Sequence, residues 1–165
     1  MCNLTDQTTG NIIAGISAGL FLLNLILTSF ISLKTFKDSN KDKQKTFLDQ
    51  QLFELQRLSF YDPYLENDNY TKEWDSLKER FNNNSLSEDE KNKFIKYDIY
   101  TEMLFNFIYK SLEFYKTKKN LEKFVDFKSW VNTHKYSWRN PLQTNSNKDV
   151  YGEQMFNIVN SWIDW

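Results

Sequence analysis

The chain has 165 residues and a formal net charge of −1. This length allows one domain of ordinary size plus a short appendage and is too short for two hydrophobic cores. The near-neutral charge gives the molecule as a whole no affinity for nucleic acid, so we expect no nucleic acid as a partner, and any argument from charge must be local. Aromatic residues make up 17% of the chain, with only 4 glycines and 2 prolines. This composition argues against disorder and predicts a folded domain.

Few residues of the kinds that bind metals or act as nucleophiles are present. Cys2 is the single cysteine and His134 the single histidine, which excludes an intrachain disulfide and any site built from several cysteines or histidines. The neighbours Trp130 and Tyr136 favour a packed or surface aromatic cluster around His134 over catalysis. No glycine-rich phosphate loop or nucleophile elbow occurs. We therefore expect no enzyme, no cofactor and no bound metal.

After a short tail over residues 1–11, an uncharged segment runs from Ile12 to Leu33. Its 22 residues would rise about 33 Å as a helix, enough to cross a hydrocarbon core of about 30 Å. Thirteen of them are Leu, Ile or Phe, which gives an insertion free energy of about −4 to −8 kcal/mol. A cleaved signal peptide would need a basic region before the segment and small residues after it, and neither is present. The segment is a predicted transmembrane helix.

Basic residues flank only the C-terminal side of this segment, at Lys34, Lys37, Lys41, Lys43 and Lys45. The positive-inside rule therefore predicts an N-terminus outside the cell and a cytoplasmic C-terminal domain. The same lysines would lie beside anionic headgroups of the cytoplasmic leaflet, so they are also candidates for lipid-headgroup contact. A topology signal alone is the simpler interpretation.

Two pairs of residues inside the apolar segment suit contact between helices. Gly15 and Gly19 form a GxxxG step that lets two backbones approach closely, and Asn24 and Thr28 lie one turn apart, where they can hydrogen-bond across a helix pair. One interpretation is a homo-oligomer formed through the span. The other is the ordinary glycine content of membrane helices.

No Gly or Pro follows the apolar segment until Pro63. We therefore expect the helix to continue over residues 34–62 as a basic juxtamembrane and stalk helix that ends at Asp62-Pro63, because the residue before proline is pushed out of the α region. Apolar residues on one side of this helix predict that it packs on the rest of the chain. They are Phe47, Leu48, Leu52, Leu55 and Leu58.

Residues 63–165 are expected to form a soluble, compact bundle of four to five helices, which makes the fold all-α. Apolar spacing predicts helices over about 64–81, 88–116, 126–136 and 150–162. Ser87 and Glu90 match a capping box at the start of the second of these. That helix is apolar around most of its circumference, so it should be the central and most buried one.

Acidic residues occupy the one polar side of the predicted central helix, at Asp98, Glu102 and Glu113. Carboxylates that converge in space bind hard divalent cations, so these residues allow a metal site if other helices add ligands. A solvated helix face is the simpler explanation.

The apolar segment, the basic helix, the stretch Leu52-Phe53-Glu54-Leu55-Gln56-Arg57-Leu58 and the break at Asp62-Pro63 follow one another within residues 12–65. In this layout the chain resembles a loose class of uncharacterised bacterial single-pass, membrane-anchored helical proteins. The resemblance implies an anchored helical domain and no activity, and it carries no functional residues across.

Together these features predict a non-enzymatic, membrane-tethered interaction or regulatory module at the cytoplasmic face, with the lipid bilayer and an unidentified protein as partners. An alternative is a small membrane-acting effector, of toxin or defence type, that oligomerises through its span. A second alternative is a cryptic metal-binding protein or enzyme that uses the acidic residues of the central helix.

Overall fold

The computed structural model describes residues 4–164, and describes side chains from residue 24 onward. This part of the chain is all-α, as the sequence predicts, with eight α-helices, one 3-10 helix and no strand. The chain divides into two compact units, Met1–Gln44 and Lys45–Trp165. We call the second unit the body.

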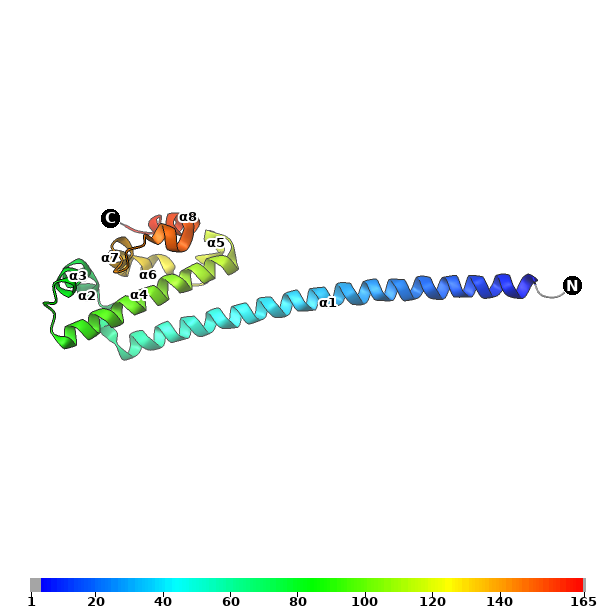
Figure 1. The fold of residues 1–165 in the computed structure, drawn as a ribbon, viewed down its shortest axis with the longest axis horizontal. Helices are drawn as coiled ribbons and strands as arrows, with labels where there is room; N and C mark the ends of the chain where they lie inside the picture. Colours follow the sequence, from blue (N-terminus) through cyan, green and yellow to red (C-terminus); the bar gives the residue numbers. More distant parts are fainter. Residues whose placement is uncertain (1–3, 165) are drawn as a thin grey trace. The chain divides into compact units, whose positions relative to one another are not determined.

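Helix α1 (Leu4–Tyr61) contains the expected span (Figure 1). Within the described part of the chain, no helix is long and apolar enough to cross a membrane. Residues 12–23 of the expected span lie outside the part whose side chains are described, and residues 24–33 lie within it, with exposed side chains.

The C-terminal part of α1 belongs to the body. It ends at Tyr61, directly before Asp62-Pro63, as the sequence predicts. Leu48 and Leu55 are buried in the core of the body, and Leu52 and Leu58 pack against that core. Phe47 does not pack in this way, since its side chain is 48% exposed.

The prediction of a single helix over residues 64–81 is wrong. This region forms a 3-10 helix, η1 (Pro63–Glu66), followed by α2 (Asp68–Lys72) and α3 (Trp74–Asn82). The break comes from Asn67, whose side-chain oxygen accepts hydrogen bonds from the backbone N–H groups of Asn69 and Tyr70 at 2.9 and 3.3 Å. Such a residue caps the following helix, so α2 starts anew instead of continuing η1.

Helix α4 (Glu88–Tyr115) is the central helix, as expected. Its capping box is formed: the backbone N–H of Ser87 donates to the Glu90 carboxylate at 2.9 Å, and the Glu90 N–H donates to the Ser87 hydroxyl at 3.4 Å. Helix α4 runs antiparallel to residues 45–61 of α1 (Figure 1). Lys96 lies 3.0 Å from Asp62 at one end of this pair, and Tyr115 shares a groove with Lys45 at the other.

Four further helices cover the side of α4 that α1 leaves open (Figure 1). They are α5 (Lys118–Leu121), α6 (Phe127–Thr133), α7 (Lys135–Arg139) and α8 (Asn147–Asn160). The helix expected over 126–136 is divided into α6 and α7 at His134, where φ is −104° and ψ 17°, and α5 was not expected. The described body therefore contains more and shorter helices than the four to five predicted.

Packing of residues 45–61 of α1 on the rest of the body depends on Leu55, which is 1% exposed. Phe60 on the same helix is 81% exposed. We expect Leu55→Ala to lower the free energy of unfolding by about 2–5 kcal/mol, because it removes buried methyl groups and leaves a cavity. Phe60→Ala, the matched control, should change it by less than about 0.5 kcal/mol. Urea unfolding followed by tryptophan fluorescence measures both values, and equal losses would show that α1 does not pack on the core through Leu55.

Candidate functional site

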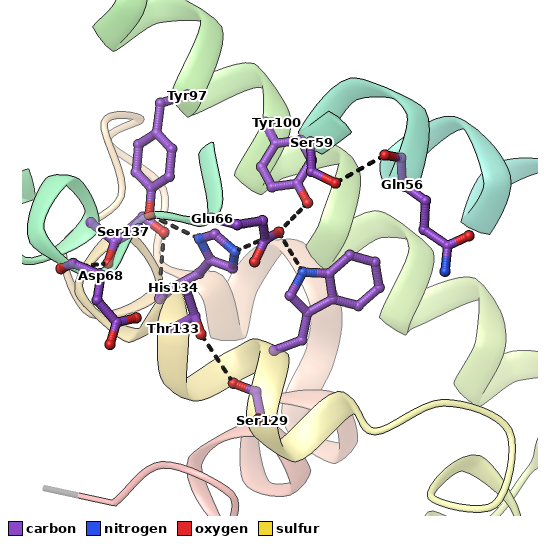
Figure 2. Close-up of polar contacts among 12 residues, drawn as sticks. Gln56, Ser59, Glu66, Asp68, Tyr97, Tyr100, Ser129, Thr133, His134 and Ser137 are labelled. Carbon is purple, nitrogen blue, oxygen red and sulfur yellow. Dashed lines mark hydrogen bonds and ion pairs between the residues drawn. The ribbon is translucent and has the colours of Figure 1, made fainter. Parts of the chain in front are cut away.

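The densest group of buried polar side chains in the described body surrounds Glu66 (Figure 2). Glu66 lies on η1, Tyr100 on α4, Trp130 on α6, and His134 at the junction of α6 and α7. One carboxylate oxygen, Oε1, accepts hydrogen bonds from the Trp130 indole N–H at 2.6 Å and from the Tyr100 hydroxyl. The same oxygen lies 3.2 Å from His134 Nε2. A single carboxylate thus joins three separate parts of the chain, and we call this group the Glu66 cluster.

The His134 ring lies among aromatic side chains, as expected, and Trp130, one of the two predicted neighbours, contacts the same Glu66 oxygen. The centroid of the His134 ring is 5.7 Å from that of Tyr97 and 5.6 Å from that of Tyr100. Its Nδ1 lies 2.9 Å from the Tyr97 hydroxyl (Figure 2). When Nε2 carries the proton, it donates to Glu66 while Tyr97 donates to Nδ1. The Tyr97 hydroxyl can also accept from Nδ1–H, so both ring nitrogens stay bonded in either charge state.

The electrostatics of the cluster favour an ionised Glu66. Burial raises the pKa of Glu66, but the hydrogen bond and charge of His134 and the bonds from Trp130 and Tyr100 outweigh burial, so its pKa is lower than its ordinary value. Burial raises the pKa of both Tyr97 and Tyr100, with the charge of Glu66 adding to the effect, so both hydroxyls remain protonated. An ionised Glu66 carboxylate with the Trp130, Tyr100 and His134 side chains around it is the stable state of this cluster.

The geometry of the Glu66 cluster suits structural support better than chemistry on a substrate. His134 and Tyr97 have no exposed surface, so a substrate cannot touch the imidazole. The nearby Ser137 hydroxyl donates to the carbonyl of His134 itself at 2.9 Å and is not aligned with the ring as a nucleophile. Sequence reasoning missed the pairing of Glu66 with His134 because they are 68 residues apart.

A second polar region is a pocket of about 200 Å³ beside α4, into which two of the predicted acidic residues project. Asp98 and Glu102 line it, and the Glu102 carboxylate accepts a hydrogen bond from the Gln143 side chain. Burial and, next, the charge of Glu102 raise the pKa of Asp98 to about 6. Helices α4 and α7 also contribute Thr101, Phe105, Asn106 and Ser137 to the lining. The segment after α7 and helix α8 contribute Pro141, Leu142, Asn145, Asn147, Val150 and Tyr151.

Glu113, the third predicted acidic residue, lies elsewhere. It is 11 residues beyond Glu102, about 16 Å along the helix, and pairs with Lys110 at 2.9 Å. Across the described residues, no group of three or more His, Cys, Asp or Glu side chains is placed to hold a metal ion. The acidic side of α4 is therefore divided between a pocket and an exposed ion pair.

The candidate residues on α1 are only partly within the described side chains. Gly15 and Gly19 lie outside them. The Thr28 hydroxyl donates to the carbonyl of Asn24 at 2.8 Å, within its own helix. Contact between two spans stays a prediction. The five candidate lysines are all exposed: Lys34, Lys37, Lys41, Lys43 and Lys45.

Comparison with known proteins gives no relative from which a function could be carried over. No protein-family model, curated protein or solved structure matches the chain. The case for a function therefore depends on the residues of this chain alone.

The lowered pKa of Glu66 makes the stability of the body pH-dependent. Its ordinary value is 4.5, so the ionised carboxylate stabilises the fold above that pH, and this stabilisation is lost as the pH falls through the lower pKa of the folded chain. We expect Glu66→Gln to lower the unfolding free energy by about 1–3 kcal/mol at pH 7, because an amide oxygen accepts weaker hydrogen bonds.

This loss should shrink as the pH falls below 4.5, since protonation of wild-type Glu66 then removes the advantage of its carboxylate. Urea unfolding across this pH range measures the difference. Glu113→Gln, which removes an exposed ion pair, should cost less than about 1 kcal/mol at pH 7. A loss in Glu66→Gln that stays constant with pH would contradict the assignment.

Asp98 should show the opposite dependence on pH. Its pKa in the folded chain is about 6, above its ordinary value of 3.8. The stability of the fold therefore falls as the pH rises from 3.8 to about 6, and the loss is complete above that range. We expect Asp98→Asn to raise the unfolding free energy at pH 8 and to have little effect near pH 4. The same urea titrations measure it, and a variant that is less stable than wild type at pH 8 would show that the Asp98 carboxylate has a favourable partner.

Proposed function

We propose that this chain is a non-enzymatic, membrane-tethered helical module that holds a protein partner at the cytoplasmic face of a membrane. The observation that carries the proposal is the exposure of large apolar side chains on α1 between residues 25 and 36. Seven of them are between 49% and 68% exposed: Leu25, Ile26, Leu27, Phe30, Ile31, Leu33 and Phe36.

These side chains surround the helix instead of forming one stripe. Leu25, Ile26 and Leu27 are consecutive, so they point in three directions about 100° apart. A helix that is apolar on all sides needs an apolar environment on all sides, which a bilayer supplies and water does not. Together with the uncharged residues that precede it in the sequence, this region supports an anchor over Ile12–Leu33. The exposed lysines that follow support an inward-facing body.

Features of the body support an interaction role over catalysis. The single histidine of the chain is enclosed in the Glu66 cluster. The layout of residues 12–65 resembles that of membrane-anchored helical proteins. Phe53 and Phe60 are 67% and 81% exposed and lie two turns apart on the side of α1 opposite Leu48 and Leu55. Exposed aromatic side chains beside charged ones are typical anchors of protein interfaces. This outer face of α1 is our candidate for the partner site.

Two matched pairs of substitutions on α1 test the tether. Ile26→Arg with Phe30→Arg should release the chain from membranes, because each arginine costs about 2.5–3.5 kcal/mol near the middle of a span and the two together offset most of the insertion free energy. Phe53→Arg with Phe60→Arg places the same charges on the same helix outside the span, so this variant should stay in the membrane. Alkaline carbonate extraction followed by immunoblotting measures the distribution. Release of the wild-type chain by carbonate would disprove the anchor.

The second pair also tests the partner. After crosslinking in intact cells, the wild-type chain should co-purify with a protein other than itself, and Phe53→Arg with Phe60→Arg should reduce that recovery about tenfold or more. Recovery of this chain alone, with or without the substitutions, would count against an interaction module.

A further inference from the structure

One end of the body carries a groove lined by basic and aromatic side chains. Its volume is about 510 Å³, and it is bordered by three helices and the segment after α5. Lys45 and Asp49 come from α1 and Tyr115 from the last turn of α4. The remaining lining residues come from α5 and the segment after it: Asn120, Lys123 and Phe124.

The antiparallel pairing of α1 and α4 places these residues together. Helix α4 returns the chain to the level of Lys45, where Lys116 adopts a left-handed conformation, with φ 65°, and ends the helix. The chain then turns into α5, and the rings of Tyr115 and Phe124 pack 5.0 Å apart. The groove thus has a partly buried aromatic wall and an exposed basic rim.

Lysines outnumber acidic residues in this region, and Asp49 is the one acidic residue that lines the groove. Residues 116–123 contain four lysines, Lys116, Lys118, Lys119 and Lys123, and a single acid, Glu122. Glu122 lies 3.7 Å from Lys118. Lys116, Lys119 and Lys123 are exposed and form no ion pair within the described part of the chain. With Lys45, they make a cationic surface, which we call the basic end of the body.

We propose that the basic end docks on the anionic phospholipid headgroups of the membrane that anchors the chain. The inference rests on the proposed tether and goes beyond it, because it assigns a second, electrostatic contact to the body itself. Charge complementarity supports this occupant, since the cytoplasmic leaflet has a negative surface potential that attracts lysine-rich segments. Tyr115 suits the same site, because tyrosine is enriched at the level of the headgroups.

Position along the chain also supports a lipid occupant. Only eleven residues separate Leu33, the end of the expected span, from Lys45, and this connection contains Lys34, Lys37, Lys41 and Lys43. The basic end therefore continues the basic flank of the span. So short a connection keeps the groove at a high local concentration of headgroups, which makes even weak contacts effective.

Thiol accessibility of the full chain in nanodiscs tests the proposal. In a Cys2→Ser background, Asn120→Cys places a thiol in the groove, and Asn83→Cys places the matched control at the exposed end of α3. Nanodiscs are made from phosphatidylcholine alone or with about 30% phosphatidylserine. We expect the anionic lipid to slow maleimide labelling at position 120 at least fivefold and to leave position 83 unchanged.

The protection should disappear at high salt, because exposed charges are screened there, and in Lys119→Glu with Lys123→Glu. Urea unfolding followed by tryptophan fluorescence checks that this variant keeps its fold. Equal labelling at position 120 in both lipids would overturn docking on headgroups. So would protection in phosphatidylcholine alone, which would point to a second copy of the chain. A chain that does not enter nanodiscs at all would overturn the tether as well, so the two proposals fail in distinguishable ways.

Discussion

The body is organised by the need to cover α4, a helix of 28 residues whose apolar side chains occupy most of its circumference. Such a helix is stable in water only when other elements pack on several of its sides. The last turns of α1 cover one side with Leu48 and Leu55, and the helices after α4 cover the other. The core is largely aromatic and leucine-rich, so a long helix and several very short ones share one hydrophobic interior. The short helices need this support, because isolated helices of four to seven residues do not persist in water.

The Glu66 cluster supplies hydrogen-bond partners to polar atoms that this packing buries. Burying His134, Tyr97 and Tyr100 at the centre of the body removes their polar atoms from water, which destabilises the fold unless each finds a partner. Glu66 accepts three hydrogen bonds at one oxygen, and Tyr97 satisfies the remaining nitrogen of His134. The cluster also holds η1 against α6 and α7, so the chain leaving α1 is fixed to the C-terminal half. We therefore regard the Glu66 cluster as a structural link between these parts of the fold.

Helix α1 combines two different demands in one continuous element. From residue 45 onward it has a buried side and an exposed side, which is typical of a helix at the surface of a water-soluble domain. Between residues 25 and 36 its apolar side chains are exposed in all directions. The lysine-rich stretch 34–45 lies where one pattern changes to the other. The basic end of the body adds further lysines beside residue 45, where the pattern with a buried side begins. The proposed anchored module, with its proposed headgroup-facing end, would explain both patterns and the position of the change.

The sequence by itself determined the features that depend on interactions within about four residues. These include the helical class, the end of α1 at Asp62-Pro63, the start of α4 at Ser87 and Glu90, and the apolar character of residues 12–33. Only the tertiary structure decided which distant residues meet. Glu66 and His134, Lys45 and Lys123, and Glu102 and Gln143 are far apart in the chain and belong to no local pattern. The cap at Asn67 is also a local interaction, although the helix periodicity of residues 64–81 concealed it. The bend at His134 was decided by packing, because the ring of His134 is buried in the Glu66 cluster. Local propensity is a sum of small terms, and the burial of large aromatic side chains on α4 outweighs it.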